Sequence, residues 1–348
     1  MMIETLLTKP AGWTDARGPE AERVVYTRAT LARNLADVPF PCRSSDDEKR
    51  SVEERVLAAI ENAGLLQQGQ YCSFNDLGDQ EAEFLAERGL VSTAIIDADG
   101  PRGVYVHDDQ CASIMVNETE HIRMVALGSG LQLQALWDRL NEVDDALTGA
   151  LDFAFHERFG YLTSSLDSVG TGLHVAAVLH LPGLAAMNEV LDVEKSAREM
   201  GHTLSGVFGK LANEPADLFC LANASTLGRS EEELVYHTRN LVTEVLQREA
   251  VARETMFEKG LRGIEDRVGR ALGVARGARL LDLEEAVGVL SSLRLGVVRK
   301  LVDEVSLKSL NELLLAAQSG HIQMKLGHDC DALALSFERA DLFRAQFN

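Results

Sequence analysis

The stretch GYLTSSLDSVGTGLH, residues 160–174, runs directly into the apolar segment HVAAVLHLP, residues 174–182. Gly170 and Gly172 flank Thr171, and glycine adopts backbone conformations that strain other residues. Glycine and serine clustered between patterned segments are typical of a loop. The stretch therefore predicts a tight glycine loop placed immediately before an apolar segment.

Patterns before this loop predict a mixed domain. An amphipathic helix is indicated from Ser45 to Leu66, and helical periodicity returns from Leu131 to about Ala154. Between these helices, short β-type runs separated by Asp and Gly predict antiparallel strands. The runs are VSTAIID (residues 91–97), RGVYVH (102–107) and CASIMV (111–116).

The last third of the chain is expected to be helical. Ser230 is followed by three glutamates, which is an N-cap signal, and it opens a long charged pattern that reaches Arg270. Further helices are predicted at Leu283–Leu293, Leu307–Ala317 and Ser336–Gln346. The fold class is therefore α+β: a mixed domain to about residue 255, then an all-helical appendage.

Composition excludes several kinds of partner. The 348 residues carry 34 basic and 54 acidic side chains, a formal charge of −20, which repels nucleic acid and anionic membranes. No stretch approaches a signal peptide or a membrane span, so we expect a cytoplasmic protein. Five widely spaced cysteines indicate a reducing compartment and no metal site; they are Cys42, Cys72, Cys111, Cys220 and Cys330.

Eight segments, in order along the chain, resemble motifs of bacterial protein-arginine kinases, within the phosphagen (guanidino) kinase superfamily. One such match would be a weak signal, but eight in the same order indicate common descent. The segments are VVYTRATLARNL (24–35), NETEHIRM (117–124), GYLTSSLDSVGTGLH (160–174), GVFGKLANE (206–214), TLGRSEEELV (226–235), IEDRVGRALGV (264–274), SLRLGVV (292–298) and SLNELLLAAQSG (309–320).

The resemblance implies a phosphagen-kinase catalytic domain, an antiparallel sheet flanked by helices, followed by a helical dimerisation domain. The corresponding division is an N-terminal segment at residues 1–22, a catalytic domain at 23–255 and a dimerisation domain at 256–348. The family's reaction moves the γ-phosphoryl group of ATP to an arginine of a protein, which marks that protein for degradation. ATP and Mg²⁺ would be needed only if this chain is active, and no cofactor is expected otherwise.

The arginines that hold phosphate in this family are only partly retained. By the resemblance, Arg28 and Arg123 occupy two of these positions, whereas Thr30, His174 and Ser205 replace three further arginines. Phosphoryl transfer depends on positioning and charge neutralisation. A hydrogen bond to a charged group contributes about 1.5–3 kcal/mol, so the three losses should weaken nucleotide binding severely. His174 would be mostly neutral at pH 7.

The residues that would bind the arginine substrate also differ from those of the family. A guanidinium needs a carboxylate to orient it and take its proton, but Thr119 and Asn213 stand at the family's two glutamate positions. Lys210 replaces another glutamate. Ser165 takes the place of the reactive cysteine, with Leu166 in place of the proline after it. No catalytic residue of the family set is therefore intact.

We therefore predict a pseudokinase that keeps the scaffold and binds proteins, such as an active kinase paralogue, an adaptor or a protease component. One alternative is an active arginine phosphotransferase in which Glu118, Glu120 or Glu214 supplies the missing carboxylate. Another is a phosphoarginine-binding module, since Arg339 keeps one arginine of the family's RDxxRA motif, with Arg344 nearby. Whether the chain is an enzyme is left open between these hypotheses.

Three structural expectations accompany these hypotheses. Arg28 and Arg123 would have a structural role if they form ion pairs with Glu118 or Glu120. His121 is expected to be a structural histidine and not a catalytic one. An apolar stripe in the C-terminal helices predicts a homodimer, unless the stripe packs on the catalytic domain. The stripe comprises Leu283, Val287, Leu290, Leu293, Val297, Leu301, Leu310, Leu313 and Leu314.

Overall fold

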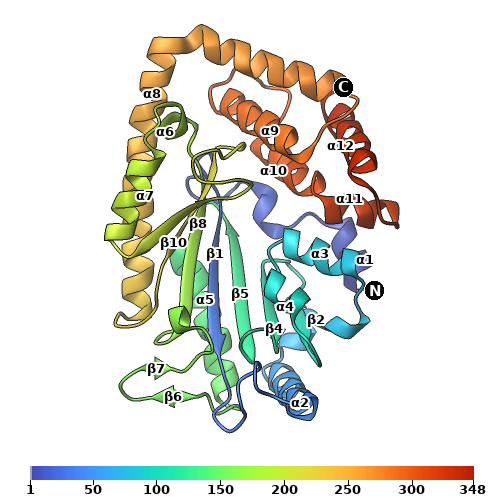
Figure 1. The fold of residues 1–348 in the computed structure, drawn as a ribbon, viewed down its shortest axis with the longest axis vertical. Coiled ribbons are helices and arrows are strands. Elements are labelled where there is room, and N and C mark those ends of the chain that lie inside the picture. The colour runs from blue at the N-terminus through green and yellow to red at the C-terminus, as the bar shows by residue number, and fades with distance from the viewer. Residues whose placement is uncertain (1) are drawn as a thin grey trace.

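The computed structural model describes residues 2–348, and an eight-stranded antiparallel sheet lies at its centre (Figure 1). The strand order is β2-β3-β4-β5-β1-β8-β10-β9, so the first strand of the chain is central. A separate hairpin is formed by β6 and β7. The strands are β1 (Val24–Arg33), β2 (Gly69–Ser73), β3 (Gly103–His107), β4 (Ala112–Val116), β5 (Ile122–Ser129), β6 (Phe155–His156), β7 (Gly160–Tyr161), β8 (Leu173–His180), β9 (His202–Gly206) and β10 (Leu218–Asn223).

Helices pack on both faces of this sheet, with α3 and α4 against β3, β4 and β5 on the face opposite to α2 and α5. One apolar cluster joins Ala29 and Leu31 of β1 to α2 and α5, and another joins β8 and β10 to α6, α7 and α8. The N-terminal segment packs with the C-terminal helices through Trp13. The helices of the first part are α1 (Met2–Thr8), α2 (Asp46–Asn62), α3 (Asp79–Glu87), α4 (Thr93–Asp97), α5 (Leu133–Thr148), α6 (Pro182–Ala186) and α7 (Val190–Glu199).

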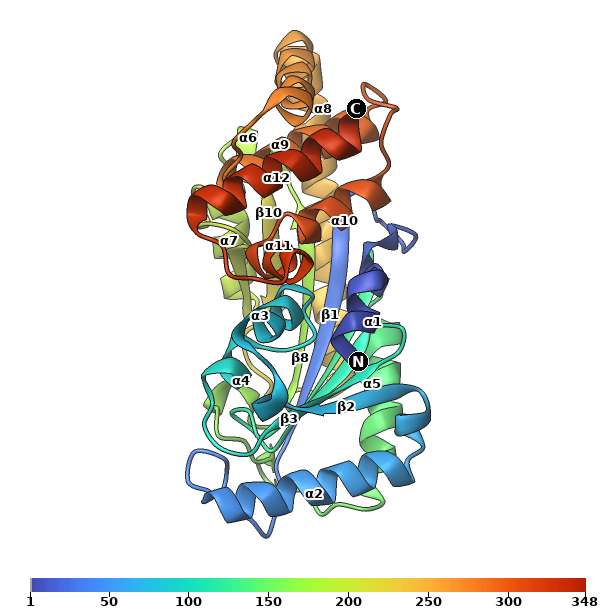
Figure 2. The same cartoon turned by 90° about the vertical axis from the view of Figure 1, so that its right-hand side faces the viewer.

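The long helix α8 (Glu231–Gly277) links the sheet to the C-terminal helices. It runs along the side of the sheet and then turns across the top, above α9, as Figures 1 and 2 show. Ser230 and Glu233 form the predicted capping box at its start, and the backbone leaves helical geometry at Gly260. The remaining helices are α9 (Leu283–Val298), α10 (Leu307–Ala316), α11 (Ser319–Leu326) and α12 (Ala332–Phe347).

The glycine loop before β8 has the geometry that its sequence predicts. Gly170 and Gly172 have φ values of +116° and +70°, in the region that favours glycine. A Cβ atom on Gly172 would come within 2.6 Å of the Ala32 carbonyl oxygen. A side chain at this position would therefore push the loop away from β1.

One predicted strand is wrong. The run VSTAIID contains the helix α4 at Thr93–Asp97, with Ser92 at its N-cap position. The helix turns Ile95 into the core, where it is fully buried. The β-branched residues suggested a strand, but tertiary packing determines the outcome for so short a segment.

The apolar stripe that suggested a homodimer is largely buried within the chain. Val287 and Leu293 are completely covered, and Leu310 is 3% exposed. These residues share a core with the sheet residue Leu218 and the N-terminal Trp13. The stripe therefore packs mainly on the same chain, and only Leu301 among its members is exposed.

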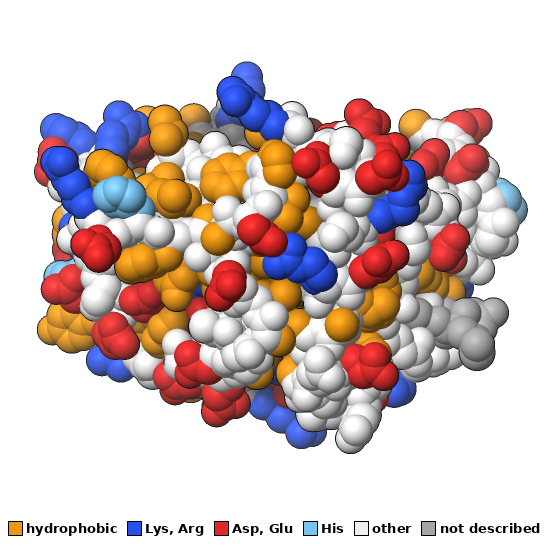
Figure 3. Space-filling model, turned by 90° about the horizontal axis from the view of Figure 1, so that it is seen from below, with side chains coloured by type: hydrophobic (Ala, Val, Ile, Leu, Met, Phe, Trp, Pro, Cys, Tyr) orange, Lys and Arg blue, Asp and Glu red, His pale blue; other side chains and the backbone are white. Residues whose placement is uncertain are grey.

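The molecular surface agrees with the acidic composition. Figure 3 shows acidic side chains spread over the face seen from below, with apolar side chains between them. Within residues 2–348, no helix is both long enough and apolar enough to cross a membrane.

A buried ion pair ties the central strand to its covering helix. Arg33 of β1 donates from Nη2 to Asp144 of α5 at 2.7 Å, and its Nε lies 3.1 Å from the other carboxylate oxygen. The Arg33 guanidinium also stacks 3.5 Å from the centre of the Tyr161 ring. The Arg33 side chain is 1% exposed, so its charge depends on this pair.

We expect Asp144→Ala to lower the free energy of unfolding by about 3–5 kcal/mol, because it leaves a buried guanidinium without its counter-charge. Urea unfolding followed by circular dichroism measures this change. Asp145→Ala is the matched control, since Asp145 is exposed on the same turn, and it should change stability by less than about 0.5 kcal/mol. Equal effects of the two substitutions would contradict a structural role for the pair.

Candidate active site

A cavity of about 350 Å³ lies on the sheet face that α5 leaves uncovered. Strands β1, β4, β5, β8 and β10 form its floor, and the segments around Ser92 and Ser165 form its sides. Five residues singled out from the sequence line this cavity: Arg28, Thr30, Arg123, Ser165 and His174.

Strand register explains why these residues meet. Thr30 of β1 pairs with His174 of β8, and Arg28 pairs with Ala176 two positions further along. Directly paired residues of an antiparallel sheet point to the same face. Arg123 joins them from β5, on the other side of β1. Alternation along β1 buries Ala29 and Leu31 on the opposite face.

Arg123 is already paired with a buried carboxylate. Its Nε donates to Glu118 Oε2 at 2.7 Å, and its Nη2 donates to the hydroxyl of Thr119 at 3.0 Å. Burial alone would raise the pKa of Glu118, but the Arg123 guanidinium and the Ser92 and Thr119 hydroxyls outweigh it and hold this pKa below its ordinary value. Glu118 is therefore ionised at pH 7, and it neutralises Arg123.

The remaining cationic character of the cavity is small. Arg28 forms no ion pair with any described side chain. Burial lowers the pKa of His174, and its ring lies 3.1 Å from the Ser168 hydroxyl, so the ring is neutral at pH 7. Asp167 also lines the cavity. The negative charge of Asp167 therefore offsets part of the positive charge of Arg28 in the same cavity.

Glu120 shapes the wall that carries Ser165. Its carboxylate accepts hydrogen bonds from the backbone amides of Ser164 and Ser165, at 2.8 and 3.1 Å, and from the side-chain amide of Asn34. The neighbouring Leu166 is 86% exposed. The Glu120 carboxylate therefore holds the loop around Ser165 in place.

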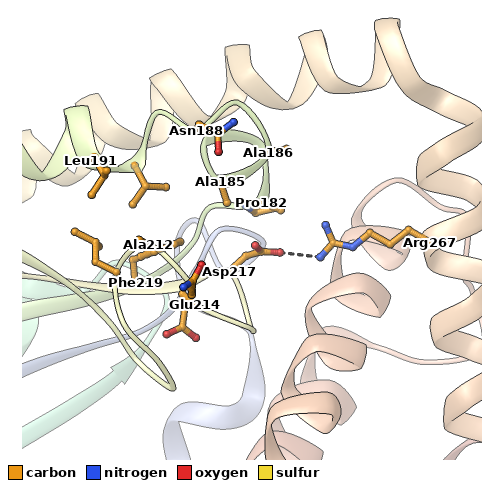
Figure 4. A pocket seen from close by; sticks show the side chains of 13 residues that line it. Pro182, Ala185, Ala186, Asn188, Leu191, Ala212, Glu214, Asp217, Phe219 and Arg267 are labelled. Carbon is orange, nitrogen blue, oxygen red and sulfur yellow. Dashed lines mark hydrogen bonds and ion pairs between the residues drawn. The ribbon is translucent and has the colours of Figure 1, made fainter.

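Asn213, which occupies a family carboxylate position, lines a different cavity. This second cavity, of about 370 Å³, lies between α6, the loop before β10 and Arg267 of α8 (Figure 4). The adjacent Glu214 accepts hydrogen bonds from the amides of Phe208 and Gly209, at 2.9 and 2.8 Å. The ion pair between Arg267 and Asp217, 2.8 Å long, closes one side. The structure therefore does not bring Asn213 together with Arg28 and Arg123.

Two further predicted site residues lie outside the first cavity. Ser205 is exposed on the edge strand β9 and pairs with Cys220. Arg339 is 3% exposed in α12, and its guanidinium donates to the carbonyls of Ala317 and Leu281. Arg344 is engaged with Ala278 and Asp341. This geometry favours a structural role for Arg339, although its phosphoarginine binding stays a prediction.

His121 has the scaffold geometry expected of it. Its Nδ1 accepts from the amide of Leu35 at 3.1 Å, and its Nε2 lies 3.0 Å from the carbonyl of Pro39. Burial lowers the pKa of His121 to about 4. The ring is neutral at pH 7 and joins two loops.

Asp167 and Ser168 are among the cavity residues that sequence reasoning missed. Both lie in the loop that precedes the Gly-Thr-Gly turn. Their polar side chains are typical of any exposed loop, so the pattern carried no signal for them. The quoted motif that contains them was the only indication of their position.

Comparison with known proteins shows the family. Residues 51–252 match the family described as ATP:guanido phosphotransferase, C-terminal catalytic domain. Residues 262–348 match that described as Protein-arginine kinase McsB C-terminal domain. The chain belongs to the protein-arginine kinase family. The two matches meet near the kink at Gly260, so the family's two parts join within α8.

Relatives named protein-arginine kinase match over the whole chain. The one from Pelotomaculum thermopropionicum is 35% identical, covering 99% of this chain and 98% of the relative. Those from Halothermothrix orenii and Symbiobacterium thermophilum are 32% and 34% identical. They cover 100% and 97% of this chain, and 100% and 96% of the respective relatives.

Solved structures of the wider superfamily share the fold. Lombricine kinase superposes with a TM-score of 0.59 at 20% identity, covering 72% of this chain and 71% of that one. The duplicated taurocyamine kinase from Schistosoma mansoni with bound transition state analog components gives a TM-score of 0.61 at 21% identity. It covers 71% of this chain and 37% of the taurocyamine kinase chain. The predicted phosphagen-kinase architecture is confirmed.

His174→Arg should tighten the binding of a fluorescent ATP analogue by at least about tenfold, because a permanent cation would replace a neutral ring beside Arg28. Fluorescence anisotropy at pH 7.5 measures the affinity. His174→Gln is the matched control, since it stays neutral and should leave binding as weak as in the unmodified chain. Unchanged affinity in His174→Arg would mean that this position does not face the phosphates.

Proposed function

We propose that this member of the protein-arginine kinase family does not transfer phosphate, and that it acts by binding proteins of an arginine-phosphorylation system in the cytoplasm. The observation that carries the proposal is that the carboxylates next to the two missing glutamate positions, Glu118, Glu120 and Glu214, already hold other groups of the protein. The family assignment gives the setting, and the geometry of the cavity supports the inactivity.

All three of these carboxylates have partners within the described part of the chain. Glu118 is paired with Arg123, and Glu120 holds the loop that contains Ser165. Glu214 accepts hydrogen bonds from backbone amides of its own loop, and it is 8% exposed. Releasing any of them would leave partly buried donors without their acceptor, which is costly.

The charges at the positions that would bind the phosphates of ATP support the same proposal. ATP with Mg²⁺ would have to bind through Arg28 and Arg123, but Glu118 offsets the charge of Arg123 and Asp167 lies beside them. Thr30 and His174 add no charge at pH 7. A polyanion in this position would meet little net attraction.

The second candidate is an active arginine phosphotransferase with a rearranged site. It is favoured by the full-length match to relatives that are named protein-arginine kinase. Asp167 would be its candidate base, because it is exposed on the wall of the cavity that holds both arginines. An assay for the formation of phosphoarginine distinguishes the two candidates.

We expect no phosphoarginine when the purified protein is incubated with Mg-ATP and either a native or a denatured substrate protein. Mass spectrometry under conditions that preserve phosphoarginine measures the product, and the Pelotomaculum relative serves as the comparison enzyme. Thr119→Glu alone should not restore activity, since the positions of Thr30, His174 and Ser205 still lack arginine. A general base contributes only about 10²–10⁴-fold.

Phosphoarginine above the no-enzyme background would favour the active candidate if it disappears in Arg28→Ala or Arg123→Ala. Asp167→Asn then tests the base, because it keeps the side-chain size and removes the proton acceptor. Product that survives all three substitutions would point to a contaminating kinase.

A second copy of the chain is the partner that we propose first. The exposed residues Leu333 and Phe337 lie one turn apart on α12, and they are 56% and 48% exposed. The amide of Leu281 donates to the carbonyl of Ser336, which brings the 49% exposed Leu280 beside them. This apolar patch remains after the predicted stripe is buried, and a two-fold contact would cover it.

Light scattering of the full chain should give about twice the monomer mass of 38.0 kDa at micromolar concentrations. Phe337→Glu should shift the mass toward the monomer, because it places a charge in the patch. Leu191→Glu is the control, since Leu191 is 57% exposed on α7, far along the chain from α12. A monomeric mass for the unmodified chain would exclude the dimer.

A further inference from the structure

A third cavity, of about 560 Å³, lies where the N-terminal segment meets the C-terminal helices. Its walls come from residues 7–14, α3, α10, α11 and α12, and Figures 1 and 2 both show α3 beside α11. None of its lining residues belongs to the cavity of Arg28 and Arg123. Its walls are largely apolar, with Leu315, Met324 and Leu342 among them.

An arginine without a counter-charge forms part of the wall. Arg88 follows α3 and is 5% exposed. Its two terminal nitrogens donate to the side-chain oxygen of Gln110 and the carbonyl of Lys9, and its guanidinium stacks on Phe84. Its Nε has no hydrogen-bond partner among the described residues, and no described carboxylate pairs with it. A buried cation of this kind favours an anion.

A second unpartnered nitrogen lies close by. His321 of α11 packs on the same Phe84 ring, at 4.5 Å between ring centres. Its Nδ1 lies 2.6 Å from Glu87, and because an ionised carboxylate only accepts, Nδ1 is the donor. The buried Nε2 has no partner among the described residues. It accepts a hydrogen bond while the ring is neutral and donates one when the ring is protonated.

The charges at the cavity are mainly positive, in a protein whose formal charge is −20. Lys9 and Lys325 line the cavity together with Arg88, against the single acidic lining residue Glu312. We propose that this cavity binds a small amphiphilic anion, an apolar chain that ends in a carboxylate or a phosphate monoester. The apolar walls take the chain, and Arg88 with the two lysines takes the head group.

Octanoate, octyl phosphate and 1-octanol test this proposal on the full chain by isothermal titration calorimetry at pH 7. We expect at least one of the two anions to bind saturably, one per chain, and at least about tenfold more tightly than octanol, because only the anions compensate Arg88. The phosphate should bind more tightly than octanoate if its hydroxyl donates to His321. Equal affinity of the two anions would assign recognition to Arg88 and the lysines alone.

Substitutions in the third cavity test whether the anion binds there. Ala316→Phe fills the cavity from α10 and should weaken the binding of the anion at least about tenfold, while Lys9→Ala/Lys325→Ala should weaken it about fivefold. Both keep Arg88, so they avoid the folding defect that Arg88→Met risks. Lys259→Ala, an exposed lysine on α8, should change nothing. Absent binding of both anions, or undiminished binding in Ala316→Phe, would overturn the proposal.

Discussion

The alternation of side chains along β1 is the constraint on which the rest of this structure depends. Ala29 and Leu31 point into a core sealed by α2 and α5, so Arg28 and Thr30 must point to the other face. The register with β8 and β5 then places His174 and Arg123 beside them. A shift of one residue would bury Arg28 in an apolar core, which strongly opposes any other register.

The ion pair between Arg123 and Glu118 limits the chemistry that this face of the sheet can support. Glu118 neutralises Arg123 through a short hydrogen bond, and its other partners are Ser92 and Thr119. In this arrangement Thr119 bridges an ion pair, whereas a glutamate at the same position would add a second negative charge. The cavity therefore has little of the cationic field that phosphoryl transfer requires.

The sequence predicted features that depend on local rules. The capping box of Ser230 and the glycine loop follow from hydrogen bonding and backbone sterics within a few residues. The helix at residues 93–97 and the burial of the C-terminal stripe depend on distant packing partners, which a local sequence pattern does not show. The pairing of Arg123 with Glu118 was foreseen as one of several options. The separation of Asn213 from Arg28 arises from the fold of the loop before β10, which its sequence does not encode in any recognisable pattern.

The melting temperature of the full chain with and without millimolar Mg-ATP shows whether this cavity binds the nucleotide. A ligand that binds only the folded state raises this temperature according to its concentration relative to its dissociation constant. We expect no shift with Mg-ATP, whereas the Pelotomaculum relative, measured alongside, should show one. A dose-dependent rise that requires Mg²⁺ and is lost in Arg28→Ala would contradict the claim that this cavity lacks a working phosphate site.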